Sequence, residues 1–188
     1  IFQTTPDGRY LAANPALADS CTGYGQGGAR VTDPNGLGKP LALTVPLVTQ
    51  VANHLTRFGS FGAGDIVFVY GGYNDIFVQF GAAAQGLPAA TAIANVNTAA
   101  TELAALVKDQ IVANGARRVA AITVYDLTQA PDFRGLPTDS KALLALLVAE
   151  YNNTITSALA NVDVRIIDVA ALFSDMIASP SKYGLTNV

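Results

Sequence analysis

Three short runs of mostly apolar residues constrain the fold of this chain more than any other feature. They read Ile-Val-Phe-Val-Tyr at 66–70, Arg-Val-Ala-Ala-Ile-Thr-Val-Tyr at 118–125 and Val-Arg-Ile-Ile-Asp-Val at 164–169. The first run, which with its leading Asp covers residues 65–70, shows no alternation of polar and apolar residues. Continuous runs of this kind are typical of parallel strands that are buried on both faces. We therefore expect three strands in one parallel sheet.

Helical patterns separate these runs and follow the last of them. Pro46 suits the first turn of a helix, while Gly59 and Gly115 suit the ends of two helices. Thr138 or Asp139 is expected to cap a third helix. The expected helices span residues 45–58, 89–114, 139–159 and 170–177, and residues 1–44 are expected to be loop. Alternating strands and helices with right-handed crossovers predict an α/β fold, with helices on both faces of a central parallel sheet in a three-layer α/β/α sandwich.

The composition limits the classes of function. The 188 residues suit a single domain, 1–188, with a sizeable core. Although 51% of the residues are hydrophobic, no run approaches the roughly 20 residues that span a bilayer. The net charge is -3 and the basic residues are scattered without a patch. We therefore expect neither a membrane span nor a nucleic-acid partner.

Both ends of the chain resemble interior sequence. The chain begins Ile-Phe-Gln-Thr-Thr-Pro and ends Lys-Tyr-Gly-Leu-Thr-Asn-Val. We expect a domain that is incomplete at both ends. The single cysteine, Cys21, is either a small buried apolar residue or a residue whose partner lies outside this chain.

The sequence Gly-Gly-Tyr-Asn-Asp at 71–75 directly follows the first predicted strand. In one interpretation, Asn74 or Asp75 caps a short helix that begins near Ile76. In the other, the side-chain amide of Asn74 donates a hydrogen bond to an oxyanion, together with backbone N–H groups from the glycine-rich turn at 25–29. The position favours a ligand site, because parallel sheets bind ligands beyond the carboxyl ends of their strands.

Several segments together resemble one enzyme family. Residues 69–77, Val-Tyr-Gly-Gly-Tyr-Asn-Asp-Ile-Phe, resemble the Gly-x-Asn-Asp block of the SGNH (GDSL) esterases and lipases. Residues 24–32, Tyr-Gly-Gln-Gly-Gly-Ala-Arg-Val-Thr, resemble the second block of that family, although Gly23 stands where the family usually has Asn. Segments 120–131, 150–155, 166–173 and 183–188 resemble later parts of the family in the same order.

The resemblance implies roles for particular residues. Gly28 is expected to give its backbone N–H to the oxyanion, and Asn74 its side-chain amide. Asp75 is expected to hold the turn through hydrogen bonds. Tyr73 and Phe77 are expected to line the substrate pocket, although packing in the core is an equally good explanation for Phe77. The family reaction requires no metal or organic cofactor.

Two catalytic groups of the family have no counterpart in this chain. The family nucleophile is a Ser in a Gly-Asp-Ser-Leu block, and its base is a His in an Asp-x-x-His block. Ser20 follows no apolar strand, so it is not expected to be the nucleophile. His54, the one histidine, lies on a predicted amphipathic helix and is expected to have a structural place. The Ser and the His are therefore expected outside this chain.

Two functions follow as hypotheses. The first is a bacterial esterase or lipase, secreted, periplasmic or on the cell surface, that acts on small-molecule or lipid esters and is completed by missing N- and C-terminal segments. The alternative is a non-catalytic binding or interaction module with an SGNH-like fold. A dinucleotide site at 23–28 is a weaker interpretation, because no clear strand precedes these glycines and no clear helix follows them.

Overall fold

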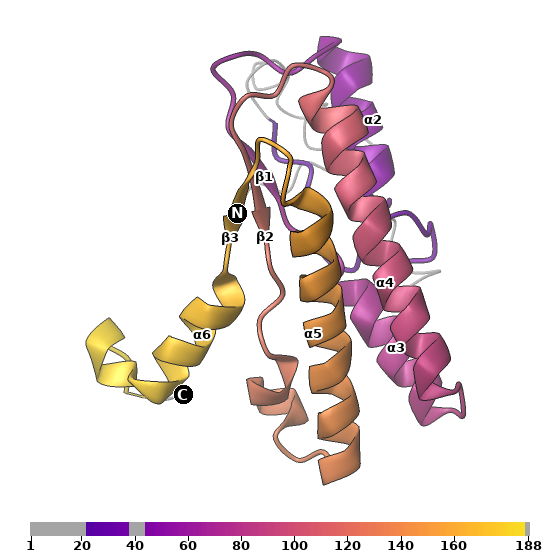
Figure 1. The fold of residues 1–188 in the computed structure, drawn as a ribbon, viewed down its shortest axis with the longest axis vertical. Helices are drawn as coiled ribbons and strands as arrows, with labels where there is room; N and C mark the ends of the chain where they lie inside the picture. The colour runs from indigo at the N-terminus through magenta and orange to yellow at the C-terminus, as the bar shows by residue number, and fades with distance from the viewer. Residues whose placement is uncertain (1–21, 38–43, 187–188) are drawn as a thin grey trace, which may run out of the picture.

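A computed structural model describes residues 22–37 and 44–186 and shows a mixed α/β fold (Figure 1). Its sheet has three parallel strands in the order β1-β2-β3, namely β1 (Val67–Val69), β2 (Val119–Ile122) and β3 (Arg165–Ile167). Val67 pairs with Val119, and Ala120 pairs with Arg165. The three predicted strands are confirmed, each shorter than the apolar run that contains it.

Helices connect the strands. They are α2 (Leu47–Phe58), α3 (Tyr73–Ala84), α4 (Ala89–Ala105) continued by a π-helix (Leu106–Val112), α5 (Thr138–Leu159) and α6 (Val169–Ala178). Short 3-10 helices span Leu127–Gln129, Pro131–Phe133 and Pro180–Tyr183. Among the described residues, no helix has the length and apolar character needed to cross a membrane.

The predicted helix ends are partly confirmed. Pro46 directly precedes α2, and Gly59, with a φ of 77°, ends it. Gly115, with a φ of 101°, follows the π-helix. The predicted cap of α5 is wrong, because Pro137 occupies the cap position and no side chain caps the first turn. Proline suits that place because it fixes φ and needs no hydrogen-bond acceptor for its nitrogen.

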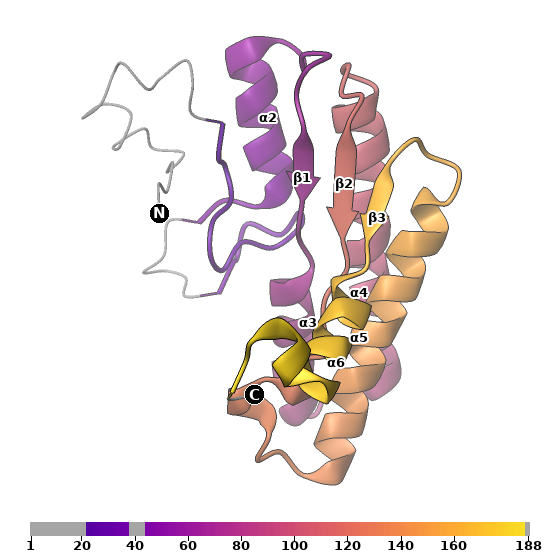
Figure 2. The ribbon, with the colours of Figure 1, turned by 90° about the vertical axis from the view of Figure 1, so that its left-hand side faces the viewer.

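Helices α4 and α5 cover one face of the sheet, whereas α6 lies toward the other side, beyond the ends of the strands (Figures 1 and 2). In Figure 1 the strands are seen edge-on, with α4 and α5 to one side of them. Figure 2 turns the opposite face of the sheet toward the viewer, and no described helix crosses the strands there. Ile66 is 61% exposed and Phe68 is 65% exposed. The α/β class is therefore confirmed for the described residues, whereas helices on both faces are not seen in them.

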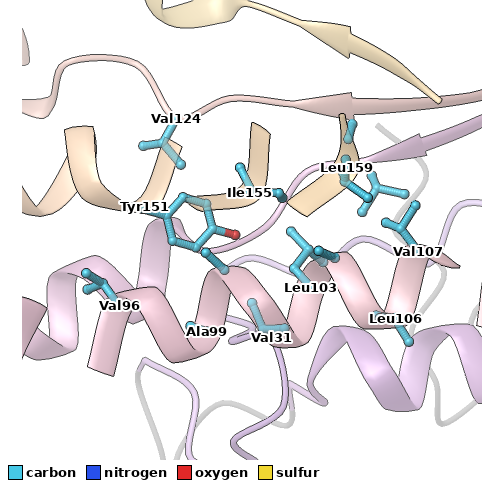
Figure 3. Packing of buried hydrophobic residues seen from close by; sticks show 14 of the residues in the cluster. Val31, Val96, Ala99, Leu103, Leu106, Val107, Val124, Tyr151, Ile155 and Leu159 are labelled. Atoms are coloured by element: carbon cyan, nitrogen blue, oxygen red, sulfur yellow. The ribbon is translucent and has the colours of Figure 1, made fainter. Parts of the chain in front are cut away.

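The core lies between the sheet and the pair α4 and α5 (Figure 3). Leu103 and Val107 from the α4 side meet Ile155 and Leu159 from α5, and all four are at most 2% exposed. Tyr151 of α5 is fully buried among them, and its hydroxyl donates a 3.1 Å hydrogen bond to the Gly71 carbonyl. The core thus reaches the turn after β1, where the candidate site lies.

Candidate functional site

The turn between β1 and α3 depends on two glycines. Gly72 has a φ of 89°, which side chains of L-residues rarely permit, and it occupies the cap position of α3. A Cβ on Gly72 would lie 1.9 Å from the ring of Tyr151, and a Cβ on Gly71 would lie 2.5 Å from Leu47. The close approach of Tyr151 and Leu47 therefore explains why glycine stands at both positions.

Asn74 connects this turn to the glycine-rich turn. Its Nδ2 donates a 2.6 Å hydrogen bond to the carbonyl oxygen of Ala29. The helix begins at Tyr73 rather than near Ile76, and no side chain caps it. The capping interpretation of Asn74 and Asp75 is therefore wrong, because both side chains bond to the turn at 29–31 instead.

Asp75 fixes the residues that follow the glycine-rich turn. It is 2% exposed and accepts a 3.1 Å hydrogen bond from the Val31 N–H and a 2.9 Å hydrogen bond from Arg30 Nε. Arg30 also pairs with Asp33. Burial raises the pKa of the Asp75 carboxyl, while Arg30 and the Val31 N–H act in the opposite direction. The predicted structural role of Asp75 is confirmed by these hydrogen bonds.

Gly28 lies at the tightest point of the glycine-rich turn. Its φ is 88°, and a Cβ there would lie 2.7 Å from the Leu37 carbonyl oxygen. Its own carbonyl accepts a 2.8 Å hydrogen bond from the Leu37 N–H. No other residue in the described part of the chain accepts a hydrogen bond from the Gly28 N–H. The described residues therefore leave this donor unused.

Gly28 and Asn74 line the same cavity, of about 400 Å³. The amide nitrogen of Asn74 carries two hydrogens, and the bond to Ala29 uses one of them. Two residues that carry uncharged N–H donors thus line one cavity beyond the carboxyl end of β1. Donors that are fixed before a reaction begins can stabilise a negative charge that develops on an oxygen atom.

Tyrosines form another wall of this cavity. Tyr70, Tyr73 and Tyr125 all line it, and the hydroxyl oxygens of Tyr73 and Tyr125 lie 2.8 Å apart. Burial is the largest cause that raises the pKa of Tyr73, and the hydrogen bond with Tyr125 adds to it. Tyr73 was predicted to line the substrate pocket, whereas Tyr125 was not predicted, although its place at the end of the second apolar run points to it.

Phe77 lies next to this wall without lining the cavity. Its ring meets Tyr73 edge-on at 4.6 Å and stacks on Phe133 at 5.3 Å. Phe77 therefore packs against Tyr73 and does not itself line the cavity. Its predicted contact with a substrate stays a prediction.

His54 lies apart from Gly28 and Asn74. It is 7% exposed, and its ring stacks on Phe61 at a centroid distance of 4.2 Å. Burial lowers the pKa of the imidazole. His54 lines a different cavity, of about 710 Å³, and does not border the smaller one. Ser20 and Cys21 lie outside the described residues.

The larger cavity runs along β1. Residues 66–70 line it on one side, and residues of α2 and of the turn at 22–27 line it on the other. In the described residues β1 pairs with β2 only, so its second edge has no neighbouring strand there. The hydroxyl of Tyr24 and Nε2 of His54 are buried and make no hydrogen bond to the described residues. This cavity therefore combines an unpaired strand edge with two unsatisfied polar groups.

A metal site is not apparent in the described part of the chain. No three His, Cys, Asp or Glu residues lie close enough there to hold an ion together. The candidate site consists instead of the glycine-rich turn, three phenols and the side-chain amides of Asn74, Gln26 and Gln50.

The chain is similar to a protein that is described as uncharacterized. No protein-family model matches the chain. Over 125 residues, 64% of its length, it is 34% identical to a Pseudomonas putida protein described as an uncharacterized protein in the trpE–trpG intergenic region. The matched stretch is 19% of that protein, so the chain spans well under a third of its length.

Proposed function

We propose that this chain is the central part of a serine ester hydrolase of the SGNH (GDSL) type, an esterase or lipase. One observation carries the proposal: Gly28 and Asn74, far apart in the sequence, line one cavity at the end of β1. Each of them has an N–H that the described residues leave unused. These are the donors that an oxyanion hole requires.

The reaction assigns a role to each donor. A Ser hydroxyl from outside this chain attacks the ester carbonyl, and a His from outside it takes the hydroxyl proton. The carbonyl oxygen becomes negatively charged and receives hydrogen bonds from Gly28 N and Asn74 Nδ2. The C–O bond to the alcohol breaks, and the His gives its proton to the departing alcohol oxygen. Water then releases the acid from the acyl-serine by the same steps.

The uncovered face and edge of the sheet support the proposal that this chain is part of a larger domain. Phe68 of β1 and the preceding Ile66 are well exposed, and the second edge of β1 has no partner among the described residues. Apolar strand edges left open promote association between chains, and parallel sheets are ordinarily covered on both faces. We therefore assign the cavity of about 710 Å³ beside β1 to a further parallel strand, and the open face to a third layer of helices.

The same strand supplies the missing nucleophile in this proposal. A strand parallel to β1 ends at the same edge of the sheet as β1, next to Gly28 and Asn74. The length of the Pseudomonas putida relative supports a longer protein, because the matched stretch is only 19% of it. The proposed substrates are small-molecule or lipid esters. The proposed location is outside the bacterial cytoplasm, secreted, periplasmic or on the cell surface.

The experiment uses the full-length gene product and a fluorophosphonate, which bonds to an activated serine oxygen. We expect one labelled serine, identified by peptide mass spectrometry outside residues 1–188, and hydrolysis of p-nitrophenyl butyrate that the label abolishes. Asn153→Ala, at an exposed position of α5, serves as a control that leaves labelling unchanged. No labelling and no hydrolysis by a folded protein would overturn the proposal.

A second function is favoured by one observation. The single histidine of the chain, His54, does not line the cavity with Gly28 and Asn74. If the full-length protein has no serine and histidine that reach this cavity, it is a non-catalytic binding module. The same labelling experiment distinguishes the two, because a binding module is not labelled.

A further inference from the structure

Among the described residues, only uncharged ones border the cavity that holds Gly28 and Asn74. Apart from glycine and alanine, its side chains are those of leucine, glutamine, asparagine and tyrosine. None of the described residues that line it is Asp, Glu, Lys, Arg or His. A charged group that leaves water for this lining gains no opposite charge from the described residues, which disfavours its binding.

The tyrosine wall is held by contacts on its outer side. The Tyr125 ring packs on Phe173 at 4.4 Å, and the Tyr73 ring packs edge-on against Phe77 at 4.6 Å. Because the hydroxyl oxygens of Tyr73 and Tyr125 lie 2.8 Å apart, one phenol donates to the other and a single O–H of the pair remains. The wall therefore offers ring faces and one hydroxyl, on side chains that have little freedom to move away.

Two phenols of this wall, Tyr70 and Tyr73, stay neutral under ordinary conditions. Burial raises the pKa of Tyr73 and of Tyr70 above the ordinary value of a phenol. For Tyr73, the nearby charge of Asp132 acts in the same direction. Tyr70 and Tyr73 thus carry neither the negative charge that attracts a cation nor a positive charge that pairs with an anion.

The position of the oxyanion donors decides which part of an ester lies here. The carbonyl oxygen binds Gly28 N and Asn74 Nδ2 in both acyl transfer steps, whereas the alcohol leaves after the first. The acyl group is therefore the part that stays next to these donors throughout the reaction.

We propose that this cavity holds the acyl group of an uncharged ester, and that the wall of Tyr70, Tyr73 and Tyr125 rejects acyl groups that end in a carboxylate or phosphate. This inference rests on the proposed function and names the substrate class of the same site. It also makes Tyr125 a specificity-determining residue. The rejection comes from the unpaired charge rather than from size, since a neutral acyl chain of equal length is accepted.

The test compares two p-nitrophenyl esters with five-carbon acyl chains, the valerate and the mono-ester of glutarate. They differ by a terminal carboxylate. For the full-length gene product, and after correction for the rates of both esters in hydroxide, we expect kcat/KM to favour the valerate by at least about tenfold. Equal values of kcat/KM would overturn the inference and leave the proposed function standing. If neither ester is hydrolysed, the proposed function fails and this inference fails with it.

A positive charge added to the wall of the cavity provides the second measurement. Tyr70 is 46% exposed and borders the cavity, so Tyr70→Lys places a cation at its rim. We expect this variant to reduce the valerate-to-glutarate ratio by about three- to tenfold, through a higher kcat/KM for the glutarate ester. Ser157→Lys adds the same charge at an exposed position of α5 and is expected to leave the ratio unchanged. An equal effect of the two variants would contradict the proposed place of the acyl group.

Discussion

Asn74 Nδ2 donates a hydrogen bond of 2.6 Å to the carbonyl oxygen of Ala29, and this bond joins the first turn of α3 to the glycine-rich turn. Gly28 directly precedes Ala29, so the residue that offers the amide also holds the turn that offers the backbone N–H. Asp75 adds two further bonds to the same turn, at Arg30 and Val31. The two proposed donors are therefore positioned by each other before any substrate binds.

Asp75→Asn is expected to destabilise the protein. The neutral side chain of this variant would remove one ion pair of the part-buried Arg30, which would keep only its pair with Asp33. It would also weaken the hydrogen bond that the Val31 N–H donates to this side chain. We expect the free energy of unfolding, measured by urea denaturation, to fall by about 2–4 kcal/mol. Asp139→Asn makes the same chemical change at an exposed position of α5 and is expected to have almost no effect. Equal stabilities of the two variants would show that Asp75 does not hold the turn.

Gly72→Ala tests the contact between the turn and the core. The variant must accept a φ of 89° and must also displace the ring of Tyr151, which would lie 1.9 Å from the new Cβ. Gly86→Ala is the matched control, because its φ of 103° is also positive but no atom lies within 4 Å of a Cβ there. We expect Gly72→Ala to lower the free energy of unfolding by at least about 2 kcal/mol more than Gly86→Ala does. A similar cost for both would mean that Tyr151 does not limit this turn.

His54 is expected to affect stability with pH rather than activity. Burial lowers its pKa, so the folded state binds fewer protons than the unfolded state. Its contribution to stability is complete above the ordinary value of 6.5 and is lost as the pH falls through the lowered folded value. His54→Phe, which keeps a ring on Phe61, should weaken this fall in the free energy of unfolding between neutral pH and about pH 5. The variant should retain ester hydrolysis, and a loss of hydrolysis in a folded variant would assign His54 a catalytic role.

The open edge of β1 predicts self-association of the isolated chain. Phe68 is 65% exposed on a strand with no second neighbour among the described residues. Residues 1–188 alone should form oligomers in size-exclusion chromatography with light scattering, and Phe68→Lys should shift them toward monomers. Leu172→Lys, which replaces an exposed apolar residue of α6, is the control. A monomeric wild-type chain at high concentration would contradict the proposed place of a further strand.

Local patterns predicted the secondary structure well where tertiary contacts do not intervene. The three apolar runs contain β1, β2 and β3, and Gly59 ends α2 as its position indicated, whereas the π-helix ends at Val112, before Gly115. The predicted start of α3 was wrong, because Gly72 adopts a left-handed conformation under Tyr151 and lets the helix begin at Tyr73. That contact joins residues far apart in the chain, so no local pattern contains it.

The candidate site was only partly visible in the sequence. Gly28 and Asn74 came from a resemblance to a family, and the structure places them on one cavity. Tyr125 was missed because its role depends on the hydroxyl of Tyr73, which approaches it only after β1 and β2 have paired. The uncharged character of the cavity was also hidden, since it results from side chains of four separate segments.

The central claim is that Asn74 stabilises the oxyanion, and the most direct test is the kcat of Asn74→Ala in the full-length gene product with p-nitrophenyl butyrate. The account predicts that kcat falls by about 10²–10³ while KM changes little, because the amide acts on the charge of the transition state. Circular dichroism would confirm that the variant is folded. An unchanged kcat in a folded Asn74→Ala variant would contradict the account and leave Asn74 with a structural role only.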